Sequence, residues 1–130
     1  MTDAKGVPLG AVLSAGQSHE SRFFEQAMDS VRIARRRRPD AIAGDKGYSY
    51  PRIRKWCSKR GIEAVIPTRS NQPRGKLSRR KYRRRNTVER CIGWLKCCRR
   101  IATRHEKLAT SFLAMVKLAM IQRCLRLLDP

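Results

Sequence analysis

The chain has 130 residues, of which 31 are Lys or Arg and only 10 are Asp or Glu, so its formal net charge is +21. Such a charge opposes compaction unless a polyanion neutralises it, which favours nucleic acid as the partner over an anionic membrane surface. Aromatic residues make up only 6% of the chain, so phosphate contacts are expected in preference to a surface of stacked bases. The length allows one domain with a modest core.

The cysteine pattern favours a reducing compartment. Five cysteines occur, an odd number, without a Cys-x2-Cys pair of the kind that binds zinc. The first ten residues are polar and mixed, unlike a signal peptide. We therefore expect reduced thiols and a cytoplasmic location.

The amino-terminal third is expected to contain a turn, a strand and a helix. Asp3–Gly6 predicts a tight turn, and Val7–Ala15 predicts the strand that follows it. A helix capped by Ser18 is expected from about His19 to Arg35, with Pro39 stopping it. A hairpin turn with only its second strand present indicates that the first strand lies upstream of this chain.

The middle of the chain predicts alternating strands and helices. A short apolar strand is expected at Ala41–Ala43, a helix at Pro51–Arg60 and a further strand at Ile62–Ile66. This order is typical of an α/β layer in which the later strands pair in parallel. Residues 68–79 are polar and basic and predict a mobile loop.

The last third predicts two long helices, Arg80–Arg104 and Leu108–Leu128. The second is apolar nearly all round but carries three cations, so it is expected to pack on the sheet or the preceding helix rather than cross a membrane. The predicted fold is therefore α/β, a mixed sheet flanked by helices. We divide the domain into a strand and helix half (1–67), a basic loop (68–79) and a helical part (80–130).

Asp45 is the first candidate site residue, because it directly follows a short apolar strand. Ligand sites in open α/β sheets form at the carboxyl ends of strands. Gly44 and Gly47 flank Asp45 and would allow another group to approach the backbone closely. An ordinary turn aspartate is the alternative interpretation.

A second candidate site is a run of four spaced residues, Tyr82, Arg85, Glu89 and Lys96. At about 100° per residue, the four fall within roughly 60° of one another on a helix. One stripe would then carry a carboxylate with a phenol, a guanidinium and an ammonium. Carboxylates can hold the metal ions of phosphodiester chemistry, and cations can hold the phosphates. The plainer alternative is a surface pair of Arg85 and Glu89, worth a few tenths of a kcal/mol.

The spacing Tyr82-x2-Arg85-x3-Glu89-x6-Lys96 resembles the fingerprint of bacterial insertion-sequence transposases of the DDE class, whose fold is ribonuclease-H-like. The segment Asp45-Lys46-Gly47-Tyr48 resembles the motif around the second catalytic aspartate of that family. Residues 6–16 and 103–109 are also similar, so the resemblance covers nearly the whole chain.

The resemblance implies a role for each motif residue. Asp45 and Glu89 would be the second and third catalytic acidic residues and would bind metal, with Mg²⁺ in two positions of the complete site and Mn²⁺ as a substitute. Tyr82, Arg85 and Lys96 would bind DNA at the transposon end. The partner would be double-stranded DNA, both transposon ends and target.

The first catalytic aspartate of the family lies on a strand upstream of the opening hairpin, and Asp3 occupies the turn instead. We therefore expect the carboxyl-terminal part of a DDE catalytic domain, an incomplete ribonuclease-H-like fold that is inactive alone. The missing amino-terminal part or a homo-oligomer would complete it. Two alternatives stay open: a non-catalytic basic nucleic-acid-binding protein, and a decayed remnant of marginal stability.

Overall fold

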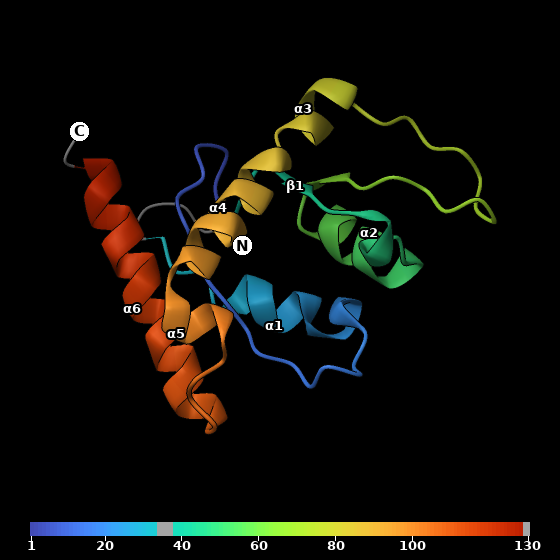
Figure 1. Cartoon of the computed structure of the whole chain (residues 1–130). Coiled ribbons are helices and arrows are strands. Elements are labelled where there is room, and N and C mark those ends of the chain that lie inside the picture. Colours follow the sequence, from blue (N-terminus) through green and yellow to red (C-terminus); the bar gives the residue numbers. More distant parts are fainter. Residues whose placement is uncertain (34–37, 129–130) are drawn as a thin grey trace.

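Helices dominate the described part of the chain and flank a small sheet (Figure 1). The structure is a computed structural model and describes residues 1–33 and 38–128. The strands are β1 (Ala41–Ala43) and β2 (Glu63–Val65). The 3-10 helices are η1 (Glu20–Phe23) and η2 (Lys46–Tyr48). The α-helices are α1 (Phe24–Asp29), α2 (Pro51–Lys59), α3 (Arg79–Arg83), α4 (Asn86–Cys97), α5 (Arg99–Ala102) and α6 (Ala109–Leu128).

The strands β1 and β2 pair in parallel, with Ile42 opposite Ala64, and α2 connects them. Parallel pairing of these two strands and the intervening helix were both predicted and are confirmed. The expected mixed sheet is wrong for the described residues, which form a sheet of these two parallel strands. The observed class is mixed α/β and rich in helix.

The core lies where α2 covers the sheet. Ile53 and Cys57, one turn apart on α2, are both 0% exposed. The helix begins at Pro51, whose missing N–H is not needed in a first turn. The helix ends at Lys59, and Gly61 follows with a φ of +62°, a conformation that favours glycine. The buried cluster comprises Phe24, Ile53, Cys57, Ile62 and Ile66.

The amino-terminal turn is confirmed, but the strand predicted over Val7–Ala15 is wrong. Asp3 Oδ1 accepts two backbone N–H groups, each at 2.8 Å, and Gly6 has a φ of +87°. In place of that strand, the described residues form an isolated antiparallel bridge between Thr2 and Pro8, one on each side of the turn. Pro8 has no N–H to donate, which limits the ladder at this point.

The helix predicted from His19 to Arg35 is shorter than expected. It consists of η1 followed by α1 and ends at Asp29. The Ser30 hydroxyl donates to a carbonyl three residues earlier, at 2.7 Å, and such bonds compete with helix continuation. The His19 side chain caps η1, in place of the predicted Ser18. Positions 34 and 35 of the predicted helix lie outside the described residues.

The single long helix predicted over Arg80–Arg104 is also wrong, because the segment divides into α3, α4 and α5. At the joint before α4, the backbone bonds of Arg84 and Arg85 run to carbonyls three residues back. The Thr87 hydroxyl donates to the Arg84 carbonyl at 2.8 Å, which tightens this turn. A second break occurs at Cys98, whose backbone is extended.

The last helix, α6, is long, as predicted, and packs along α5 and α4 (Figure 1). Its inward face buries Val116 and Ala119. Its opposite face leaves four large apolar side chains exposed: Leu118, Ile121, Leu125 and Leu128. Within the described ranges, none of the helices is long and apolar enough to span a bilayer.

Candidate functional site

Asp45 lies just beyond β1, in the turn that leads into η2. Its Oδ1 accepts the N–H of Gly47 at 2.8 Å and so caps η2. A Cβ at position 47 would lie 2.8 Å from this oxygen, which explains the glycine. An ordinary turn aspartate would make the same capping bond. The bond uses Oδ1 alone, so the second carboxylate oxygen, Oδ2, is not part of the cap. The side chain remains 45% exposed.

Arg69 holds the turn from the other side. Its Nε donates to the Lys46 carbonyl at 3.2 Å and its Nη2 to the Gly47 carbonyl at 3.4 Å. Its guanidinium also lies 4.5 Å from the centroid of the Tyr50 ring. Arg69 is not among the predicted site residues, because the sequence shows it only as one of several basic residues in the loop 68–79.

Arg85 brings the two candidate motifs together. Its Nη1 lies 3.8 Å from Asp45 Oδ2, and its Nη2 donates to Glu89 Oε1 at 2.5 Å. Its guanidinium carbon is 5.8 Å from the centroid of the Tyr82 ring. Asp45 and Glu89 are 44 positions apart in the sequence, yet their carboxylates contact one guanidinium. Four of the five predicted site residues therefore form one cluster.

The break between α3 and α4 shapes this cluster. Tyr82 belongs to α3, Arg85 is the last residue before α4, and Glu89 lies in the first turn of α4. The expectation that all the motif residues share one continuous helix is therefore wrong. The Arg85–Glu89 pair keeps its i,i+4 spacing, and the amino-terminal end of a helix favours a carboxylate such as Glu89.

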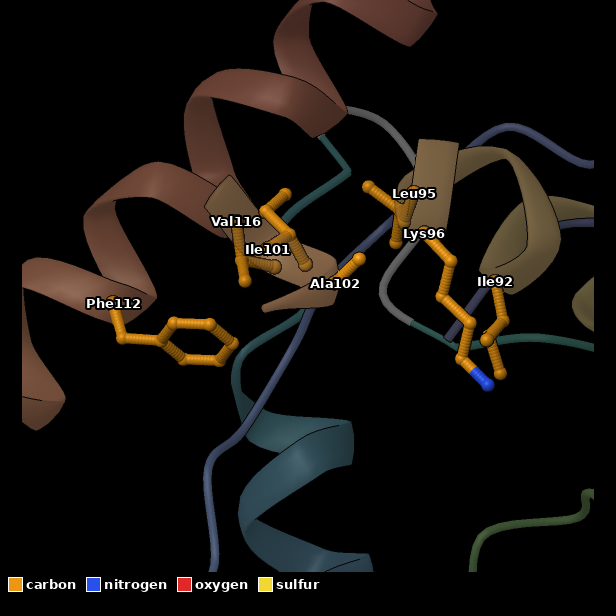
Figure 2. A pocket seen from close by; sticks show the side chains of 7 residues that line it. All are labelled: Ile92, Leu95, Lys96, Ile101, Ala102, Phe112 and Val116. Atoms are coloured by element: carbon orange, nitrogen blue, oxygen red, sulfur yellow. The ribbon is translucent and has the colours of Figure 1, made fainter. Parts of the chain in front are cut away.

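Lys96 is the predicted site residue that, among those described, does not join the cluster. It lies two turns beyond Glu89 on α4 and lines an apolar hollow of about 500 Å³. The other lining residues are Ile92, Leu95, Ile101, Ala102, Phe112 and Val116. Figure 2 shows the Lys96 side chain running along Ile92, with its amine turned away from Phe112.

The donor atoms of the cluster fit a divalent metal ion in part. Asp45 and Glu89 offer carboxylate oxygens, the ligands that Mg²⁺ prefers, and both side chains are partly exposed. Residues 1–33 and 38–128 contain no group of three or more His, Cys, Asp or Glu side chains placed to hold a metal ion. The two carboxylates can therefore supply two ligands, and Arg85 partly neutralises their charge.

Tyr48 lies beside the Asp45 turn and packs against the core. Burial raises the pKa of the Tyr48 phenol, and the negative charges of Glu20 and Asp45 raise it further. The phenol therefore stays protonated at neutral pH.

Comparisons with known proteins agree with the resemblance in the sequence. The family model for the transposase DDE domain matches residues 1–122. A protein of Burkholderia cepacia, assigned as the transposase for insertion sequence element IS402, is 30% identical over 130 residues. That alignment covers 95% of this chain and 60% of the relative, so the chain spans about 60% of the relative's length. No solved structure matches the chain.

Proposed function

The chain belongs to the family of transposase DDE domains, and from this premise we propose that it carries part of a site for DNA transposition. The reaction would be phosphodiester hydrolysis and strand transfer at the ends of an insertion sequence. The observation that carries the proposal is the contact of Arg85 with both Asp45 and Glu89. This contact joins two motifs that the sequence keeps far apart.

Asp45 and Glu89 are the proposed metal-binding and catalytic carboxylates. Transposases of this family generally use divalent metal ions, and Mg²⁺, or Mn²⁺ in its place, suits the oxygen ligands. Such ions, when bound, activate the attacking oxygen and stabilise the leaving oxygen of a phosphodiester. The two carboxylates would hold the ions, while the Gly47 amide fixes one Asp45 oxygen and leaves Oδ2 toward the cluster.

Tyr82, Arg85 and Lys96 are the proposed DNA contacts. Arg85 pairs with the two carboxylates in this structure, and metal ions there would compete with it for the same oxygens. Once displaced, its guanidinium could bind a phosphate in a forked geometry. The Tyr82 ring lies beside the guanidinium and would help to orient it toward the DNA.

The proposed fold of the whole catalytic domain is ribonuclease-H-like. Two features support it: the parallel β1–α2–β2 unit, and a carboxylate at the end of β1 that contacts the same arginine as a second carboxylate on a later helix. Asp45 and Glu89 both contact Arg85, and the resemblance implies a third catalytic carboxylate, which residues 1–33 and 38–128 do not place with these two. We propose that the amino-terminal region of a longer protein or a second copy supplies it, and that this chain alone is inactive.

Metal binding tests this proposal without requiring activity. Mn²⁺ is titrated into the chain bound to a 20-base-pair duplex, and free Mn²⁺ is followed by electron paramagnetic resonance. We expect weak binding in excess of that of the duplex alone, and Asp45→Asn and Glu89→Gln should each abolish this excess, because each removes a ligand charge. Asp29→Asn, at an exposed position on α1, is the control and should bind as the wild type does. Equal binding by all four proteins would overturn the assignment of the site.

A non-catalytic basic nucleic-acid-binding protein is the second candidate, and the net charge of +21 favours it. The two candidates differ in a complex reconstituted with an amino-terminal part. Under the first, Glu89→Gln abolishes Mg²⁺-dependent cleavage while DNA binding is unchanged or tighter. Under the second, no cleavage occurs in either protein. Cleavage by the isolated chain that persists in Asp45→Asn would refute both the proposed site and its role.

A further inference from the structure

A second hollow, which is bordered by cationic and hydrogen-bonding side chains, lies between the start of η1 and the start of α2. Its volume is about 460 Å³, and its lining includes two arginines, an imidazole and a phenol. The lining residues are His19, Ser21, Arg22, Tyr50, Pro51 and Arg52, which we call the η1–α2 groove. The only carboxylate in contact with its cations among the described residues is Glu25, which pairs with Arg52.

The groups of the η1–α2 groove are held in place by the protein itself. Arg52 Nη2 donates to the carbonyl of Ser21 at 2.7 Å, while its Nη1 pairs with Glu25. Ser21 is 5% exposed, and its Oγ lies 2.9 Å from His19 Nδ1. The His19 ring meets the Tyr50 ring edge-on, with centroids 5.5 Å apart. A ligand would therefore bind to prearranged groups at a lower entropic cost.

The groove adjoins the Asp45 turn. A Cβ at Gly47 would lie 4.0 Å from His19 Cε1, so the imidazole borders the backbone that Asp45 caps. Arg69 links the two places, because it stacks over Tyr50 and donates to the carbonyl of Gly47. Cationic and hydrogen-bonding groups thus continue from the groove to the proposed catalytic carboxylates.

We propose that the η1–α2 groove binds a phosphate of the DNA backbone next to the phosphodiester that Asp45 and Glu89 act on. This inference rests on the proposed function. Arg22 supplies the charge, because it is exposed and makes no ion pair with a described residue. Arg52 and the Tyr50 hydroxyl supply directed hydrogen bonds. The groove is a positioning site, separate from the Tyr82, Arg85 and Lys96 set.

The salt dependence of DNA binding tests the inference. Each phosphate neutralised by a cation contributes about one unit to the slope of log K against log salt concentration. Affinity for a 20-base-pair duplex is measured by fluorescence anisotropy at several salt concentrations. We expect Arg22→Gln to lower the slope by about one unit and the affinity at least threefold. Arg22→Lys should restore the slope, because the charge returns.

Two controls separate the possible results. Arg126→Gln, exposed near the end of α6, should leave the slope unchanged. Tyr50→Phe should weaken binding with an unchanged slope, because it removes a hydrogen bond and no charge. If the wild type binds DNA but Arg22→Gln matches Arg126→Gln in slope, the groove inference fails while the proposed function stands. If the wild type does not bind DNA, both fail.

Discussion

The β1–α2–β2 unit and the helix α6 both contain large apolar residues, but they bury them very differently. In the first, Ile53 and Cys57 are 0% exposed, and Val65 is 2% exposed. In α6, Val116 and Ala119 are buried, while Leu118 is 59% and Leu128 is 79% exposed. Apolar content is thus a poor guide to burial, and the position of a residue relative to a packing partner is a better one.

The physical reason is the number of faces that each element must cover. The helix α2 has one apolar face, and the parallel strand pair meets that face. The helix α6 is apolar on nearly all sides, and α4 and α5 cover one side of it (Figure 1). A helix that is hydrophobic all round requires partners all round.

The largest expected effect comes from the core of the first region. Ile53→Ala should lower the free energy of unfolding by about 3 kcal/mol, since it removes buried methyl groups and leaves a cavity. Leu118→Ala, which removes a similar side chain from the exposed face of α6, should cost less than about 0.5 kcal/mol. Urea denaturation followed by circular dichroism measures both. Equal losses of unfolding free energy would mean that Ile53 and Leu118 do not differ in burial.

Thiol labelling compares regions within one molecule, because all five cysteines are free. Cys57 is buried and Cys97 is exposed, and burial raises the pKa of the Cys57 thiol, so it holds less reactive thiolate. We expect Cys57 to react about a hundredfold more slowly than Cys97 at neutral pH, because the core must open first. Mass spectrometry of a maleimide time course measures both rates, and similar rates would contradict a closed core.

The raised pKa of Cys57 also predicts that the free energy of unfolding decreases at high pH. In the unfolded chain this thiol loses its proton at a lower pH than in the folded protein. Its contribution to stability is therefore complete below about pH 9 and is lost as the pH rises through the folded-state pKa. We expect the urea midpoint to fall above about pH 9 and the decrease to be smaller in Cys57→Ala.

Arg85→Gln is expected to have a moderate effect on binding. Losing the guanidinium should weaken DNA binding about fivefold, as for one charge-assisted phosphate contact, and should strengthen Mn²⁺ binding, because the cation that competes for Asp45 and Glu89 is gone. Arg84→Gln, the adjacent control, removes the same charge without touching the carboxylates. If both variants change Mn²⁺ binding equally, Arg85 has no special relation to the proposed metal ligands.

The smallest expected effect on stability concerns the outer face of α6. The double change Leu118→Gln and Leu125→Gln should alter the free energy of unfolding by no more than about 0.5 kcal/mol. It should reduce self-association, because exposed apolar patches promote it. Dynamic light scattering over a range of protein concentrations tests this. A loss as large as that of Ile53→Ala would show that this face is buried in solution.

Local features of the sequence determined much of the fold. Pro51 and Gly61 mark the ends of α2, Asp3 and Gly6 form the first turn, and β1 has the predicted bounds of Ala41–Ala43. Each of these depends on the dihedral angles and hydrogen bonds of a few neighbouring residues, which the sequence states directly. The spacing of the Tyr82 to Lys96 motif also indicated the family that the comparisons establish.

Only the tertiary structure decided the contacts between distant segments. Three features depend on how all the elements pack together. They are the contact of Asp45 with Arg85, the hydrogen bond from Arg69 to the Asp45 turn, and the face of α6 that stays exposed. The break at Arg84–Arg85 was not predictable from the spacing of apolar residues, because that spacing does not depend on the tightening of a single turn. Local propensity fixes elements such as β1 and α2 in this protein, and packing fixes which side chains share a site.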